Sequence, residues 1–157
     1  MVDVTWLKKA ELFEALSESQ LNLLLFHSSV ESFPEETVLF RQGEKANRFY
    51  VLIKGLVELT VKTQGEAPLM TSQIQKEGAV FGIPSLLEPY RYNVTATCLK
   101  ATNVLMMDAE YIKRHMEEDP RMGMEILKKL TSIYFTRLNE LRLGVSNLLQ
   151  GLKPKTP

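Results

Sequence analysis

The fold of this chain is decided by residues 37 to 59, which read TVLFRQGEKANRFYVLIKGLVEL. Three short apolar runs, rich in β-branched and aromatic residues, are separated there by turns at Gly43 and Gly55. Glycine adopts the positive φ that tight turns need without steric cost. We therefore expect three strands that pair in chain order as an antiparallel meander, over Thr37–Phe40, Phe49–Ile53 and Leu56–Val61.

The sequence changes its periodicity on both sides of this stretch. From Val4 to Phe26 apolar residues recur at helical spacing, and Ser17 with Gln20 has the spacing of a capping box that restarts a helix. Between residues 30 and 108, short apolar runs alternate with turn signals. Beyond Asp108, which can cap a helix, Pro120 suits the first turn of a second, longer helix.

These patterns predict a mostly β protein with flanking helices, built around an eight-stranded jelly-roll β-barrel. We expect N-terminal helices over residues 1–29, the barrel over 30–108, C-terminal helices over 109–150 and a disordered tail over 151–157. With 157 residues and 45% hydrophobic content, the chain can bury one good core but not a second sizeable one.

Charge and cysteine content narrow the classes of partner. The 19 basic and 19 acidic side chains cancel, so no global field attracts nucleic acid or anionic lipid. Cys98 is the one cysteine and falls in an apolar strand, where a buried small side chain in a reducing compartment is expected. No signal peptide or membrane-spanning stretch is visible. We expect a cytoplasmic protein that contacts neither nucleic acid nor membrane.

The order and spacing of several short pieces resemble one family over most of the chain. These pieces are the Gly43 turn followed by Ala46-Asn47, the pair Phe49-Tyr50, the Lys54-Gly55 turn and the later Phe81-Gly82. Together they resemble the cyclic-nucleotide-binding domain of bacterial catabolite activators, cAMP-dependent kinase regulatory subunits and gated channels. The resemblance implies a non-catalytic regulatory domain whose pocket holds a cyclic nucleotide.

The sequence departs from the family pattern where the ligand would be held. In the family, a Glu after Phe-Gly holds the ribose and an Arg nine or ten residues later pairs with the cyclic phosphate. Ile83 replaces the Glu and would present a stiff apolar side chain to the ribose hydroxyls, and the Arg position falls on Tyr92 or Asn93. We predict a degenerate pocket formed by Phe81, Gly82, Ile83, Ser85, Arg91, Tyr92, Asn93 and Thr95.

A second interpretation of the sequence retains binding of the cyclic nucleotide. If the loop around residues 88–92 were one residue tighter than in the family, Arg91 could reach the phosphate, with Tyr92, Asn93 or Thr95 as neutral donors beside it. The other interpretation of Arg91 is a solvated loop charge. We expect no cofactor, with binding of cAMP or cGMP disfavoured.

Motifs for catalysis or metal binding are absent from the sequence. His27 and His115 are far apart and neither has a companion at metal-ligand spacing, so each is expected in the core or at the surface. No Gly-x-Ser-x-Gly elbow or phosphate-binding loop occurs. We expect no enzymatic activity and no metal site.

The apolar spacing of the long C-terminal helix predicts dimerisation. Apolar residues at alternating steps of seven, four and three form the seam of a two-stranded coiled coil, comprising Leu127, Tyr134, Leu138, Leu141, Val145 and Leu148. The resemblance implies the same role, because the long helix of catabolite activators dimerises the protein. A helix packed against its own barrel is the alternative. Too few residues follow for a helix-turn-helix domain.

We therefore expect a homodimeric, non-catalytic regulatory module with a degenerate phosphate pocket, which acts mainly through contacts with an unknown protein. The alternative is a cAMP or cGMP sensor with a shifted phosphate contact.

Overall fold

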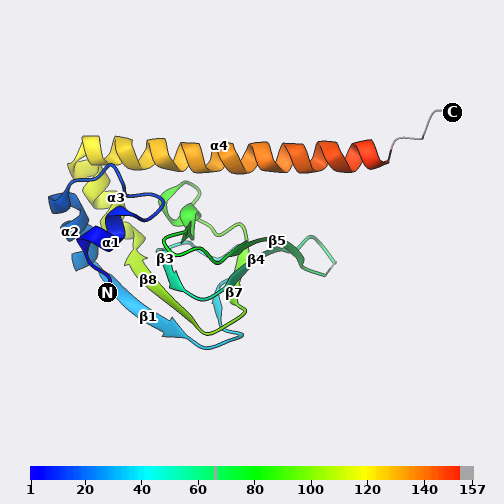
Figure 1. The fold of residues 1–157 in the computed structure, drawn as a ribbon, viewed down its shortest axis with the longest axis horizontal. Helices are drawn as coiled ribbons and strands as arrows, with labels where there is room; N and C mark the ends of the chain where they lie inside the picture. The colour runs from blue at the N-terminus through cyan, green and yellow to red at the C-terminus, as the bar shows by residue number, and fades with distance from the viewer. Residues whose placement is uncertain (66, 153–157) are drawn as a thin grey trace.

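Helix caps fix the N-terminal part of the chain. In the computed structural model, which describes residues 1–65 and 67–152 (Figure 1), Asp3 caps α1 (Val4–Lys8) by accepting a hydrogen bond from the Trp6 amide. Ser17 and Gln20 form the predicted capping box at the start of α2 (Glu18–Phe26), with bonds of 3.2 and 2.9 Å. The helix restart is confirmed, whereas residues 9–16 form turns although their apolar spacing is helical.

Eight strands are present in the described part of the chain, and they form two antiparallel four-stranded sheets. One sheet has the order β1-β8-β3-β6, and the other has the order β2-β7-β4-β5. Their bounds are β1 Ser28–Phe33, β2 Val38–Phe40, β3 Arg48–Lys54, β4 Val57–Val61, β5 Leu69–Ile74, β6 Val80–Phe81, β7 Thr95–Cys98 and β8 Thr102–Asp108.

The predicted strands exist, but the predicted meander is wrong. Strand β3 pairs with β8 and β6, whereas β2 and β4 both pair with β7 in the other sheet. The chain crosses between the sheets at Gly55, whose φ is +130°. A Cβ at Gly55 would lie 2.7 Å from the Cα of Thr102, so only glycine allows this close crossing. The described strand pairs form two separate sheets rather than the closed barrel that we expected.

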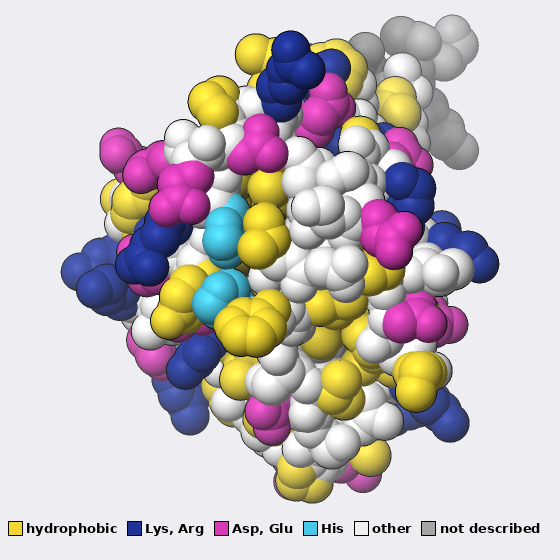
Figure 2. Space-filling view, turned by 90° about the vertical axis from the view of Figure 1, so that its left-hand side faces the viewer, with side chains coloured by type: hydrophobic (Ala, Val, Ile, Leu, Met, Phe, Trp, Pro, Cys, Tyr) yellow, Lys and Arg dark blue, Asp and Glu magenta, His cyan; other side chains and the backbone are white. Residues whose placement is uncertain are grey.

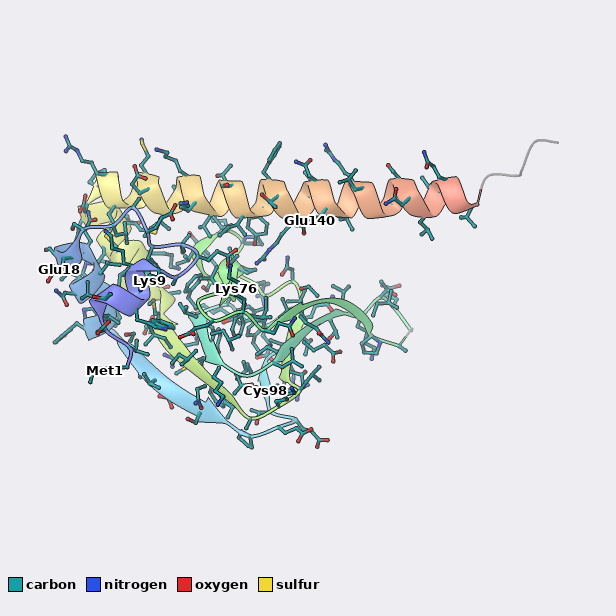
Figure 3. The ribbon with its side chains drawn as sticks, viewed as in Figure 1. Met1, Lys9, Glu18, Lys76, Cys98 and Glu140 are labelled. Carbon is teal, nitrogen blue, oxygen red and sulfur yellow. The ribbon has the colours of Figure 1, made fainter. Side chains whose placement is uncertain are left out.

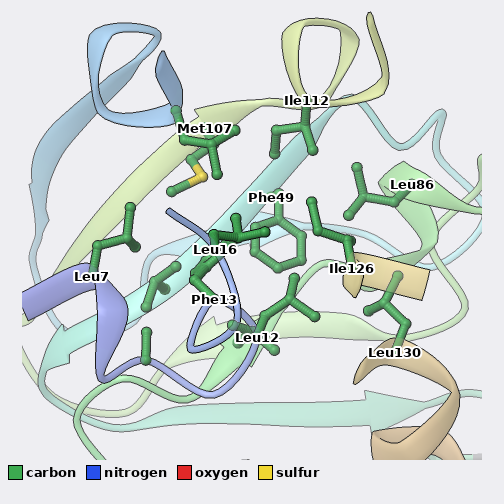
Figure 4. Packing of buried hydrophobic residues seen from close by; sticks show 14 of the residues in the cluster. Leu7, Leu12, Phe13, Leu16, Phe49, Leu86, Met107, Ile112, Ile126 and Leu130 are labelled. Carbon is green, nitrogen blue, oxygen red and sulfur yellow. The ribbon is translucent and has the colours of Figure 1, made fainter. Parts of the chain in front are cut away.

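Two hydrophobic clusters occupy opposite faces of the β1-β8-β3-β6 sheet. Side chains alternate along β3, so that Phe49 and Val51 face the helices while Tyr50 and Leu52 face the second sheet. The helix-facing cluster gathers Leu7, Leu12, Phe13 and Leu16 from the N-terminal segment with Ile112, Ile126 and Leu130 from the last two helices (Figure 4). The inter-sheet cluster takes residues from strands of both sheets.

The C-terminal helices begin as predicted. Asp108 caps α3 (Ala109–Glu118), and Pro120 occupies the first turn of α4 (Pro120–Gly151), a 32-residue helix. Side chains of α4 are buried only as far as Ile133. The rest of the helix leaves the helix-facing cluster and runs above the β4-β5 hairpin (Figures 1 and 3), and Glu140 projects from it (Figure 3).

The predicted tail, 151–157, starts too early, because Gly151 belongs to α4 and Leu152 caps it. Residues 153–157 lie outside the described part of the chain. None of the described helices is long and apolar enough to span a membrane.

Candidate functional site

The residues predicted to form the pocket lie in different surroundings. Phe81 and Tyr92 are buried between the two sheets, whereas Ile83 belongs to the helix-facing cluster. Arg91 and Asn93 are exposed. The expectation that Ile83 faces the ligand space is therefore wrong, because its side chain packs on the other side of the β1-β8-β3-β6 sheet.

Four aromatic rings fill part of the inter-sheet space. Phe40 stacks on Tyr92 with centroids 3.8 Å apart, and Tyr50 stacks on Phe81 at 4.9 Å. Phe40 also lies 5.7 Å from Tyr50 and links the two pairs. All four rings are at most 5% exposed. This aromatic cluster packs the interior with side chains of the protein itself.

The hydroxyl of Tyr92 is held by backbone. It accepts a hydrogen bond from the Arg48 amide at 3.1 Å and donates one to the Arg48 carbonyl at 2.8 Å. Burial raises the pKa of the Tyr92 phenol, and burial also raises the pKa of Tyr50. The cluster is therefore neutral and offers no cation to an anion.

Arg91 points away from the interior. Its Nη1 donates to the Gly43 carbonyl at 2.9 Å, and its backbone forms an isolated antiparallel bridge with Lys45. Since successive residues of an extended segment face opposite sides, the buried position of Tyr92 keeps Arg91 outside.

The turn after Phe81 hydrogen-bonds to its own backbone. Gly82 has a φ of +75°, and a Cβ there would lie 2.9 Å from the Arg48 carbonyl oxygen. The following single turn of 3-10 helix, η1 (Ile83–Leu86), is buried, and the Ser85 hydroxyl donates to the Gly82 carbonyl at 2.7 Å. Thr95 accepts from the Gln42 amide at 3.0 Å. These two hydroxyls satisfy neighbouring backbone groups.

Most of the predicted seam of α4 is exposed among the residues that the structure describes. Leu127, Leu138 and Val145 are 43 to 47% exposed, and Leu141 and Leu148 are 64 and 67% exposed. Tyr134 is half-buried beside the helix-facing cluster.

Sequence reasoning missed an apolar groove beside this seam. A groove of about 1030 Å³ lies between the first half of α4, α3 and the loop after η1. Tyr90 of that loop has a φ of +56°, and Lys113 lies 3.9 Å from its ring centroid while it pairs with Glu110 at 2.9 Å. Only the three-dimensional fold brings these segments together, so no local motif could have predicted the groove.

The two histidines also meet, although they are far apart in sequence. The ring of His27 stacks on Tyr111 at 3.9 Å and lies 5.6 Å from the ring of His115 (Figure 2). They come from the end of α2 and from α3, which the fold packs side by side. No three His, Cys, Asp or Glu side chains that could hold a metal ion are grouped among the described residues.

Comparisons with known proteins agree with this fold. Residues 30–119 match the family model described as the cyclic nucleotide-binding domain. The chain is similar to the global nitrogen regulator of Nostoc sp., with 32% identity over 110 residues, 68% of this chain and 48% of the regulator. It is also similar to the CRP-like cAMP-activated global transcriptional regulator of Mycobacterium tuberculosis, with 24% identity over 79% of this chain and 55% of the regulator.

A solved structure matches at nearly full length. A Geobacter metallireducens protein that has been assigned to the cyclic nucleotide-binding proteins aligns with a TM-score of 0.77 and 25% identity, covering 88% of this chain and 99% of that one. By contrast, the chain spans about half the length of the two curated regulators.

Proposed function

Since the chain belongs to the cyclic nucleotide-binding domain family, we propose that it is a non-catalytic regulatory module that has lost the cyclic-nucleotide contact and acts through protein contacts. The observation that carries the proposal is the aromatic cluster. Tyr92 stands at one of the two positions where the family resemblance expects the phosphate-binding Arg, and its ring stacks on Phe40 inside the protein.

The absence of a cation for the phosphate should weaken the binding of a cyclic nucleotide. A cyclic phosphate is an anion, and burying it without a charged partner is costly. Loss of a charge-assisted hydrogen bond reduces binding by roughly 1.5–3 kcal/mol, or about 10- to 100-fold in affinity. The four rings add a steric cost, because a ligand in the inter-sheet space would have to displace them.

The alternative, a sensor that uses Arg91, is less well supported. To face the interior, Arg91 would have to give up its bond to the Gly43 carbonyl. Its neighbour Tyr92 would then turn outward and lose both bonds to Arg48. A one-residue shift of this kind exchanges the inner and outer faces of the segment.

We further propose a homodimer that forms through the α4 seam. The exposed seam residues have no covering element in the described chain, and large apolar patches of this kind mark interaction sites. Burial of each leucine contributes about 1.5–3 kcal/mol, so four such side chains can offset the cost of association.

Calorimetric titration with millimolar cAMP and cGMP tests the lost contact. We expect no saturable binding by the unmodified chain. A dissociation constant below about 10 μM, equivalent to roughly 7 kcal/mol, would contradict the proposal. If binding appeared, Arg91→Ala would identify its source, because only the shifted-contact alternative loses affinity in that variant.

A further inference from the structure

Strand β1 forms an outer edge of its sheet. It is the first strand in the order β1-β8-β3-β6, and among the described residues it pairs only with β8. In Figure 1 it lies along the outside of the molecule. Strands β2 and β6 are also edge strands but have three and two residues, whereas β1 has six. An edge of this length offers a row of backbone donors and acceptors to another strand.

The hydrogen bonds of β3 show which way its backbone groups point. The Leu52 amide donates to the Ala79 carbonyl at 2.9 Å, and the Leu52 carbonyl accepts from the Gly78 amide at 2.8 Å. The backbone groups of Leu52 therefore point toward β6. Because these directions alternate along a strand, the backbone groups of the neighbouring Val51 point toward β8.

The same alternation continues across β8 to β1. Val51 is opposite Leu105, whose backbone groups therefore point toward β3. The neighbouring Val104 then directs its groups toward β1, where its partner is Glu31. Since the backbone of Glu31 faces β8, alternate residues of β1 direct their amides and carbonyls toward the open edge. These residues are Ser28, Val30 and Ser32.

An apolar patch lies next to this edge. Phe26, at the end of α2, is 82% exposed, and its ring lies 5.0 Å from that of His27, which stacks on Tyr111 of α3. Figure 2 shows hydrophobic side chains beside the two histidines. Val30 is also exposed, and its side chain lies on the side of the sheet that the helices cover, because its partner Leu105 belongs to the helix-facing cluster. We call Phe26, Val30 and Tyr111 the edge patch.

We infer that the open edge of β1 binds an extended segment of another protein, which adds a strand to the β1-β8-β3-β6 sheet. The outward amides and carbonyls of β1 bond to the backbone of the added strand. Side chains on one face of that strand lie beside the edge patch, so apolar residues suit alternate positions. On the other face, a Lys or Arg pairs with Glu31, the one charged residue of β1. The partner is therefore an extended peptide in which apolar and basic residues alternate.

A second copy of this chain fits the edge less well. In the two-fold pairing that continues one sheet, two β1 strands run antiparallel. The edge patch beside the start of β1 then faces the turn that follows β1 in the other copy, which contains Pro34, Glu35 and Glu36. Phe33 does not cover the patch either, because it packs with the inter-sheet cluster on the opposite face. An acidic turn leaves the apolar rings uncovered, which favours a different protein as the occupant.

Hydrogen exchange with a selected peptide tests the inference, which rests on the proposed action through protein contacts and names the surface that makes them. The probe comes from a phage library of linear random peptides, selected on the unmodified chain. We expect the enriched peptides, once synthesised, to protect the amides of Ser28, Val30 and Ser32 from exchange measured by NMR. The amides of Ser29 and Glu31 are the internal reference, because they face β8 and stay protected with or without peptide.

A proline at position 30 tests the backbone contact directly. Val30→Pro removes an amide that faces the open edge, so the fold should survive, which circular dichroism checks. We expect peptide binding to weaken at least about tenfold, because one bond is lost and the proline ring obstructs the added strand. Val30→Ile is the matched control, since it keeps the amide and the apolar side chain and should change the affinity by less than about twofold. The exchange measurement uses the unmodified chain and decides the matter if Val30→Pro fails to fold.

Several results would overturn the inference. Equal peptide affinities of the unmodified chain and folded Val30→Pro would do so, as would a library that yields no binder. Peptides that protect amides elsewhere would reject the β1 edge while action through protein contacts stands. Protection of the edge amides that grows with the concentration of the free chain would identify a second copy as the occupant. The proposed function fails separately, through saturable binding of cAMP or cGMP in the calorimetric titration.

Discussion

The hydroxyl of Tyr92 bonds to both backbone groups of Arg48, accepting from the amide at 3.1 Å and donating to the carbonyl at 2.8 Å. One side chain thus supplies two bonds that a neighbouring strand would otherwise make at the start of β3. The same ring stacks on Phe40. Tyr92 therefore joins the loop before β7 to the edge of β3 and to the inter-sheet core.

Removal of that hydroxyl should destabilise the fold. Tyr92→Phe keeps the stacked ring but leaves two backbone groups of Arg48 without this partner, at a cost of about 1–3 kcal/mol. Urea unfolding followed by circular dichroism measures the change. Tyr111→Phe is the control, because its hydroxyl lies on a half-exposed ring and its loss should change the stability by less than about 0.5 kcal/mol. Equal effects in the two variants would contradict this role of Tyr92.

Stability should fall in alkali. Burial raises the pKa values of Tyr50 and Tyr92 above the ordinary phenol value, so the unfolded chain releases these protons first as the pH rises. Their contribution is fully present below about pH 10 and is lost as the pH rises above it. Unfolding by urea at a series of pH values measures the decline. A stability that stays constant well above pH 10 would contradict the burial of these phenols.

Two glycines should respond in opposite directions to alanine. Gly55→Ala sets a Cβ 2.7 Å from the Cα of Thr102 at a φ of +130°, so we expect a loss of at least about 1–3 kcal/mol. Gly144 lies in α4, and a Cβ added there would meet nothing within 4 Å, so Gly144→Ala should stabilise the helix by up to about 1 kcal/mol. Thermal melts and helical ellipticity report both changes.

The seam prediction has a control within the same helix. Leu138→Glu with Leu141→Glu sets like charges in the seam and should yield a folded monomer near 17.9 kDa in light scattering. Leu143→Glu changes a side chain that is 65% exposed but lies on the opposite side of α4, so it should leave the dimer intact. Dissociation by Leu143→Glu alone would indicate that the helix associates through another face.

Sequence reasoning succeeds where the signal is local. The capping box at Ser17, the cap at Asp108 and the glycine turns depend on neighbouring residues, and each occurs where it is expected. The family resemblance is confirmed as well. Sheet membership could not be predicted, because turn spacing alone does not tell whether the chain stays in one sheet or crosses to another.

The site is harder to predict because its parts are distant in sequence. Tyr92 is among the predicted pocket residues, but the sequence marks its partner Phe40 only as the end of a strand. The prediction for Ile83 places it on the wrong side of the sheet, since the turn at Gly82 redirects the chain in a way that spacing does not report. The groove and the histidine pair depend on segments that meet only through packing.

Through Tyr90 and Tyr92, the loop after η1 contacts both the surface groove and the inter-sheet core. Tyr90 lines the groove beneath Lys113, and two residues later Tyr92 closes the inter-sheet core. An occupant that shifts Tyr90 therefore acts on a segment whose other end is fixed by stacking and by the Arg48 backbone. A protein that occupied the groove would therefore contact the same short loop that closes the inter-sheet core.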